Sequence, residues 1–444
     1  MKKSLLLTAL IASVASLAAT TGTVELEVKN EMKVEKANDV KLSENKTSAK
    51  LKSEVKVANS GFSFGTELGL KELTLFKLGE KEPTQFEGFK TLKEKNDGSK
   101  VWAKYELPEL KGFHSSVKAE YNIPEKIKAE VDANYEIKDK ATLGYNTTSE
   151  LKLGEKFEGK NITSTQKVYL NVTNPKFVDS KLEAEVKHDW QFEKKANKKL
   201  PEPKFSESVK DIRGEATLNY KVLDNLVLGG EAYIKYINFV DANGEGEYRN
   251  FLTGKKDEKF DKGLKHVGTD AAAFNLTYEK DKLKLENKVF LQHIFEPYNG
   301  TLYHSLFYGV NLKGTYIAVT NLTLTADTTL GGKCLDIKHN EQEYYGYIKA
   351  DLGAKYDYKL IDTITLTPEL NAKVIADDLS VKNEFPMISL EIKPKLSVAY
   401  KPIPKFTVSA NAELPITLDN EVDGEKFEFR NVQIKPSVNV KYEW

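Results

Sequence analysis

Apolar and polar residues alternate along most of this 444-residue chain, and this two-residue period constrains its fold more than any other feature. In EKIKAEVDANYEIK, residues 125–138, aliphatic or aromatic side chains alternate with Lys, Glu, Asp and Asn. TITLTPELNAKV (363–374) and KFTVSANAELPITL (405–418) repeat the pattern. Because successive side chains of a β-strand point to opposite faces, the sequence predicts an all-β fold whose strands have one apolar and one polar face.

Short and long connections alternate between these strands. Tight turns are expected at nine places: 57–61, 107–112, 137–140, 174–179, 223–225, 279–282, 319–321, 360–362 and 401–405. The two strands between successive turns are joined by a longer polar segment, except at 121–126, where the sequence offers only a tight turn. One edge of the sheet therefore has turns and the other has loops, as in an antiparallel barrel of about 20 strands, within a range of about 16 to 20.

A sheet of this size would expose unpaired edges unless it closed on itself. A tyrosine precedes many of the tight turns: Tyr105, Tyr135, Tyr220, Tyr278, Tyr358 and Tyr400. In a membrane barrel these residues would form an interfacial girdle on the short-turn side. A soluble sandwich would also alternate, but about 20 strands exceed what two packed sheets usually hold. We predict one large antiparallel transmembrane β-barrel with its apolar row toward lipid.

The first residues, MKKSLLLTALIASVASLAAT, have two lysines, an apolar run and small residues near Ala18. This pattern is typical of an export signal, expected at 1–18 with cleavage after Ala18 or Ala19. Residues 19–46 are expected to form an N-terminal segment with at most a first strand, and 47–444 the barrel. No later stretch reaches the roughly 18 apolar residues of a membrane helix, so any further crossing must use strands.

Charge and cysteine content exclude other classes of protein. The chain has 66 basic and 66 acidic residues, so removing Lys2 and Lys3 leaves 64 against 66, a net charge of −2. Nucleic-acid binding would show as a basic excess or cluster, so we expect no nucleic-acid partner. The single cysteine, Cys334, cannot form an internal disulfide.

The last residues, NVQIKPSVNVKYEW (431–444), keep the alternation up to a terminal tryptophan. They resemble the carboxy-terminal signature of Gram-negative outer-membrane β-barrel proteins, porins among them, although Phe is the commoner last residue there. The resemblance implies an outer-membrane location, short periplasmic turns, longer extracellular loops and contact with outer-membrane lipid. It also implies that the barrel assembly machinery reads an assembly signal. The residues of that signal are Val438, Val440, Tyr442 and Trp444.

Porin-type barrels commonly form trimers, so the resemblance also implies a homo-oligomer, although no strand can be identified as its interface. Against the ideal barrel, Pro368, Pro394 and Pro436 share one register in three predicted strands. Each proline removes a donor from the hydrogen-bond ladder. Bulges or strand breaks near the rim are the two expected ways to accommodate them.

The polar row supplies candidate pore-lining residues, because a barrel of 16 to 18 strands already leaves an aqueous channel. These residues are Lys128, Glu130, Asp132, Glu183, Glu185, Lys187, Lys282, Lys284, Glu391, Lys393 and Lys395. The longest loop, about 240–269, is a candidate constriction if it folds inward, although charge runs usually face water and favour a solvated surface loop. Its candidate residues are Arg249, Lys255, Lys256, Asp257, Glu258 and Asp261.

These features favour an outer-membrane pore for passive diffusion of small hydrophilic solutes or ions. A barrel that serves mainly as a surface binding or adhesion protein is the first alternative, and a soluble periplasmic lipid-binding β-protein is the second. An enzyme, a metal site and a cofactor are not expected, because no HExxH or GxSxG motif occurs. Two of the six histidines, His293 and His304, lie near one predicted rim, without an identified nucleophile.

Overall fold

The computed structural model describes fourteen segments of the chain. They are residues 20–36, 40–70, 99–122, 126–152, 161–172, 174–192, 203–204, 209–240, 246–261, 264–298, 301–335, 343–380, 387–420 and 428–443. The expected export signal and Trp444 lie outside these residues. No helix within the segments is long and apolar enough to cross a membrane.

Every regular element of these segments is a β-strand. The strands are β1 (Thr20–Lys36), β2 (Val40–Val57), β3 (Phe62–Leu70), β4 (Lys100–Glu106), β5 (Phe113–Asn122), β6 (Lys126–Ile137), β7 (Ala141–Lys152), β8 (Asn161–Val172), β9 (Ser180–Phe192), β10 (Pro203–Lys204), β11 (Val209–Leu223), β12 (Leu226–Phe239), β13 (Glu247–Tyr248), β14 (Glu258–Lys259), β15 (Lys265–Lys280), β16 (Leu283–Tyr298), β17 (Thr301–Val319), β18 (Leu322–Leu335), β19 (Glu343–Tyr356), β20 (Tyr358–Ile361), β21 (Ile364–Leu379), β22 (Met387–Ile403), β23 (Phe406–Glu413), β24 (Ile416–Asp419) and β25 (Glu428–Glu443).

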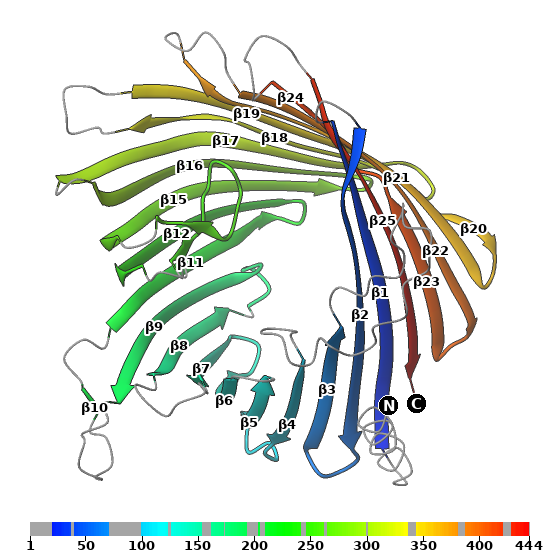
Figure 1. Cartoon of the computed structure of the whole chain (residues 1–444). Helices are drawn as coiled ribbons and strands as arrows, with labels where there is room; N and C mark the ends of the chain where they lie inside the picture. Colours follow the sequence, from blue (N-terminus) through cyan, green and yellow to red (C-terminus); the bar gives the residue numbers. More distant parts are fainter. Residues whose placement is uncertain are drawn as a thin grey trace.

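All strands except β13 and β14, which form a separate two-stranded sheet, form one closed antiparallel barrel (Figure 1). Consecutive strands pair with one another, and β25 returns to pair with β1, where Val440 lies opposite Leu26. Three short segments only continue the pairing of a longer neighbour: β10 continues β11 along β9, β20 continues β19 along β21, and β24 continues β23. If each of these three segments is counted with the strand that it continues, the 23-stranded sheet has 20 barrel strands, which we call staves. The predicted fold class is confirmed.

All nine predicted tight turns join neighbouring strands on the same side of the barrel. In several of them one residue takes a positive φ, as Asp139 (56°) and Asp281 (53°) do in two related turns. Asp and Asn tolerate this conformation because their short side chains can hydrogen-bond locally. At Gly112, φ is 82° and the carbonyl accepts a hydrogen bond from the amide of Glu136 at 2.8 Å. Turn residues and strand period therefore specify the same up-and-down order.

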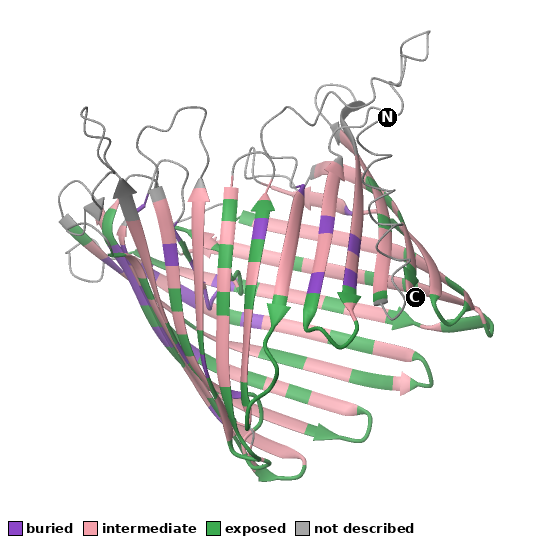
Figure 2. Ribbon diagram, turned by 90° about the horizontal axis from the view of Figure 1, so that it is seen from below, coloured by how far each residue is buried: buried purple, intermediate pink, exposed green. Residues whose placement is uncertain are grey.

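The two faces of the wall differ as the alternation predicts (Figure 2). On β9, Leu182 is 55% exposed on the outer face, whereas the next residue, Glu183, is 5% exposed on the inner face. Glu183 is held there by Lys167 (2.7 Å) and Lys181 (2.9 Å). An outer face with this much exposed apolar surface is stable in lipid rather than in water. Lipid also requires that every backbone group be satisfied, and the closed ladder leaves no open edge in the apolar layer.

Within the described residues, the first stave is β1, which starts at Thr20 and pairs with β2 and β25. The boundary expected between residues 46 and 47 falls within β2, which spans Val40–Val57. Tyrosines do gather beside the short turns on the outer face; for example, Tyr135 is 49% exposed and Tyr358 47% exposed. Such residues sit with the ring in apolar surroundings and the hydroxyl near water.

Breaks in neighbouring strands accommodate the three prolines. Opposite Pro368, the stave made of β19 and β20 is interrupted at Asp357, whose carboxylate accepts a hydrogen bond from Thr367 at 2.8 Å. Pro394 lies opposite Leu414 in the gap at 414–415 between β23 and β24, a gap that itself holds Pro415. Pro436 pairs with Ala412 of β23, and the interruption beside it lies on the other side, where the pairing with β1 skips Asn30 and Glu31. A proline nitrogen cannot donate to the ladder, so the adjacent strand loses its partner there.

Candidate functional site

The connection between β12 and β15 folds into the barrel instead of standing in solvent (Figure 1). Its described part, residues 246–261, carries the hairpin β13–β14 and packs on the inner wall. Phe251 and Leu252 are buried against Tyr233, Phe290 and Tyr347, which come from β12, β16 and β19. We call residues 246–261 the inner loop. This placement differs from the solvated surface loop that its charge runs favoured.

A second apolar cluster holds the ends of the inner loop. The rings of Tyr248 and Phe260 are in contact, tilted by 32° with centroids 4.4 Å apart. Both are buried against Ile237, Val267 and Ile294 of the wall. Burial raises the pKa of the Tyr248 phenol above its ordinary value, because the charged form would lose its hydration. Phe260 donates its backbone N–H to the carbonyl of Gly246 at 3.0 Å, so the inner loop starts and ends at one point.

Gln292 of β16 fixes the tip of the inner loop to the wall. Its side chain is 0% exposed; Nε2 donates to the carbonyl of Arg249 (2.7 Å) and Oε1 accepts from the amide of Phe251 (2.8 Å). Nε2 also donates to the Thr269 hydroxyl at 2.9 Å. One amide side chain thus satisfies a buried donor and a buried acceptor of the loop backbone. Without these hydrogen bonds, the two buried backbone groups would each destabilise the docked loop.

Arg249 projects from the inner loop between two wall carboxylates. Its guanidinium lies 3.4 Å from Glu215 of β11 and 3.1 Å from Glu231 of β12. Lys288 also contacts Glu231 at 2.7 Å. The Arg249 and Lys288 cations lie 4.5 and 4.4 Å from the Phe251 ring centroid. Planar guanidinium forks suit such multiple carboxylate contacts, which accounts for an arginine in a chain whose other cations are nearly all lysine.

The other predicted constriction residues lie on the same inner loop. Lys255 contacts Glu258 at 3.7 Å, and Glu258 accepts a hydrogen bond from Thr253 at 3.4 Å. Lys256, Asp257 and Asp261 lie beside them without contacting the Arg249 network in the described structure. Over 246–261 the charges are four acidic and four basic residues, so the inner loop has no net charge.

Ten of the eleven predicted pore-lining residues take positions on wall strands. They are Lys128, Glu130 and Asp132 on β6, Glu183, Glu185 and Lys187 on β9, Lys284 on β16, and Glu391, Lys393 and Lys395 on β22. They share the parity of the inner face, and most have a neighbour of opposite charge, such as Glu286 for Lys284 at 3.0 Å. Lys282 instead lies in the tight turn between β15 and β16.

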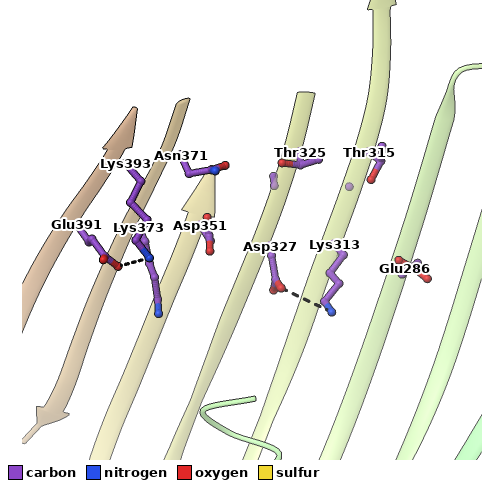
Figure 3. A pocket seen from close by; sticks show the side chains of 12 residues that line it. Glu286, Lys313, Thr315, Thr325, Asp327, Asp351, Asn371, Lys373, Glu391 and Lys393 are labelled. Carbon is purple, nitrogen blue, oxygen red and sulfur yellow. Dashed lines mark ion pairs between the residues drawn. The ribbon is translucent and has the colours of Figure 1, made fainter. Parts of the chain in front are cut away.

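A hollow of about 370 Å³ opens in the lumen wall over β16–β22 (Figure 3). One register row crosses it on successive staves: Glu286, Lys313, Asp327, Asp351, Lys373 and Glu391. The hollow shares Glu286 and Lys313 with a larger recess of about 880 Å³, which reaches Arg249 of the inner loop. The two spaces form one polar path along the wall, between the inner loop and the short turns.

Several residues of this site were not predicted from the sequence. Glu215, Glu231, Lys288 and Gln292 all lie on predicted strands with inward parity, but alternation makes every inward polar residue equivalent. The missing information is the register between staves, which decides the residues that face the inner loop. Of the predicted set, the structure brings only Arg249 into the wall network.

The two rim histidines form a hydrogen-bonded chain on the outer face. His293 Nδ1 lies 2.9 Å from Asp270, and His293 Nε2 lies 2.9 Å from Nδ1 of His304. On β16, His293 has the same parity as the exposed Leu291, and on β17, His304 has the same parity as the exposed Tyr308. Both histidines therefore lie outside the lumen, near the long-loop rim. No three His, Cys, Asp or Glu side chains within the described segments are grouped to hold a metal ion.

Neither a family model nor the sequence of a curated protein matches this chain. Solved structures match along its length. OccK3 (OpdO) of Pseudomonas aeruginosa matches with a TM-score of 0.44 and 8% identity, covering 95% of this chain and 96% of its own. The outer membrane channel DcaP of Acinetobacter baumannii gives 0.39 and 11%, covering 97% and 99%. OmpT, an outer membrane protein of Vibrio cholerae, gives 0.35 and 10% in its trimer form, covering 96% and 100%.

The architecture itself carries the classification. The sheet is closed, its outer face is apolar, and its inner face is polar and carries many ion pairs. Only a closed barrel satisfies all backbone groups of strands within a membrane. An even number of antiparallel staves, with short turns on one side and longer loops on the other, is the form of a transmembrane β-barrel.

Proposed function

We propose that the chain forms a water-filled pore through which small hydrophilic solutes and ions diffuse passively, narrowed by the inner loop. The observation that carries the proposal is the attachment of residues 246–261 to the inner wall through Gln292 and Arg249. A barrel of about 20 strands is wider than the 16 to 18 strands that leave an aqueous channel. A loop docked inside such a barrel reduces the open area without filling it, and thereby sets a size limit.

The lumen charges support weak ion selectivity. Cations and anions are interspersed along the inner wall and on the inner loop, and most are paired at distances such as 3.6 Å for Lys313 and Asp327. A strong preference for one sign of ion needs a segregated ring or wall of one charge. Paired charges instead supply hydration and hydrogen bonds to solutes of either sign. We therefore expect similar permeabilities for potassium and chloride.

The proposal assigns transport and no catalytic step to the chain. The histidines with hydrogen bonds to each other and to Asp270 lie on the outer face, away from the path that a solute would take. For assembly, the proposal keeps Val438, Val440 and Tyr442 as part of the signal read by the assembly machinery. Its support is that β25 carries them along the seam with β1, the last pairing needed to close the barrel.

The test is the current through the folded protein in a planar bilayer under a potassium chloride gradient. The proposal predicts stable conductance steps and a reversal potential near zero. A large reversal potential of either sign would contradict the balanced lumen. Stable insertion without any current would contradict the pore and would favour a barrel that serves as a surface binding protein.

A further inference from the structure

Two charged side chains in the hollow have no charged partner within the described part of the chain. Asp351 of β19 and Lys373 of β21 lie directly opposite each other, yet their charged atoms are more than 4.0 Å apart. Among the described residues, neither makes an ion pair or a hydrogen bond. The charges on both sides are paired: Lys313 with Asp327 at 3.6 Å, and Lys393 with Glu391 at 2.9 Å (Figure 3). The hollow thus presents one unpaired anion next to one unpaired cation.

Oxygen atoms gather beside Asp351 above Gly353. Gly353 is two residues along β19, on the same inner face, and lies between Thr325 of β18 and Asn371 of β21. A Cβ at Gly353 would collide with Thr325 Oγ1 and Asn371 Oδ1, so both oxygens lean over the glycine from opposite sides. The Asn371 amide is oriented by its Nδ2, which donates to Glu369 at 2.8 Å, leaving Oδ1 as an acceptor.

We infer that this hollow is a subsite for small zwitterionic solutes of the α-amino acid type. The solute ammonium would contact Asp351 and the oxygens of Thr325 and Asn371, and its carboxylate would contact Lys373. Charge-assisted hydrogen bonds favour such contacts, and a zwitterion can satisfy both unpaired charges at once. A solute with one charge would satisfy only one of them.

The position of the hollow suits transit rather than retention. It lies on the short-turn side of the inner loop and continues into the recess that reaches Arg249. Asp351 and Lys373 remain partly exposed, so each contact is weakened by water. A pore needs binding that is strong enough to favour entry and weak enough to permit release. The inference rests on the proposed pore and adds the class of solute.

The experiment measures block of the potassium chloride current by glycine, with glycinamide and acetate as its singly charged analogues. The full chain is used at neutral pH in about 0.1 M salt, where the screening length is about 10 Å. Two contacts in place of one predict that glycine blocks at a concentration about fivefold lower than either analogue. Asp351→Asn or Lys373→Gln should each remove this preference. As a matched control, Lys128→Gln with Glu130→Gln removes a wall pair 3.8 Å apart and should leave the preference intact.

Gly353→Ala provides a second variant, because the added methyl displaces the Thr325 and Asn371 oxygens while changing no charge. It should weaken glycine block and leave the current in potassium chloride nearly unchanged. Equal block by the three solutes, or an unchanged preference after Asp351→Asn, would overturn the inference. If no current flows, the proposed pore fails, and calorimetry of glycine binding to the detergent-folded barrel then tests the subsite separately. Glycine binding to the natural chain that is lost in Lys373→Gln supports the subsite. No glycine binding to the natural chain overturns the subsite.

Discussion

Replacing Gln292 by leucine should release the inner loop from the wall. Leucine keeps the volume but leaves two buried backbone groups without partners: the carbonyl of Arg249, now 2.7 Å from Nε2, and the amide of Phe251, now 2.8 Å from Oε1. An unsatisfied buried group costs about 1–3 kcal/mol, so two groups weaken docking by about 2–6 kcal/mol. At the middle of this range, about 4 kcal/mol, the undocked population rises by nearly a thousandfold.

Hydrogen exchange measures this change directly, because loop amides exchange when the inner loop opens locally. Amides of residues 246–261 that are hydrogen-bonded, such as Phe260 to Gly246, should lose protection, while those of the staves stay protected. Gln166→Leu is the matched control, since Gln166 is exposed on the outer face of β8 and its side chain makes no hydrogen bond to the described residues. Unchanged loop protection in Gln292→Leu would refute the view that this side chain holds the loop.

Four further outcomes follow from the same structure. Arg249→Gln removes one positive charge next to two wall glutamates, so the reversal potential in a salt gradient should shift toward potassium selectivity; a shift toward chloride would contradict the placement of Arg249. Val131→Lys puts a charge on the lipid-facing side of β6 and should destabilise the barrel by up to about 2–4 kcal/mol, measured by urea unfolding from bilayers. Thr148→Lys puts the charge in the lumen, opposite Glu130, and should destabilise the barrel much less. Burial raises the pKa of Tyr248, so docking of the inner loop is fully stable below the ordinary tyrosine pKa of about 10 and weakens as the pH rises above it. Unitary conductance should therefore be constant up to that pH and increase beyond it. Tyr248→Phe should abolish the increase. Deleting Trp444 should lower the amount of folded barrel in the outer membrane, and normal levels would remove the assembly role assigned to the last residues.

The fold was largely predictable because alternation and turn chemistry repeat along the whole chain. In β6, Ile127 and Val131 mark one face and Lys128 and Glu130 the other, and a one-residue slip would put all four on the wrong side. The nine turns then fix the order of strands. The prolines were harder to interpret, since the break opposite Pro368 lies in another strand, and only the pairing register reveals it.

The site was less predictable because it depends on contacts between residues far apart in sequence. The loop charges favoured water, but Phe251, Leu252 and Phe260 supply enough apolar surface to dock the loop on the wall. These aromatics stand between charged residues and show no periodicity. Likewise, Asp351 and Lys373 look like ordinary inward charges until the register places them opposite each other without an ion pair.

The most direct test of the central claim compares single-channel conductance of the natural chain with that of a variant lacking residues 247–259. The deletion joins Gly246 to Phe260, whose backbone groups already lie 3.0 Å apart, so the wall is left undisturbed. In about 1 M potassium chloride, where charges are screened beyond about 3 Å, the difference reports the open area. A pore narrowed by the inner loop predicts that both proteins conduct and that the variant has the larger unitary conductance. Equal conductances, or no current through either protein, would contradict it.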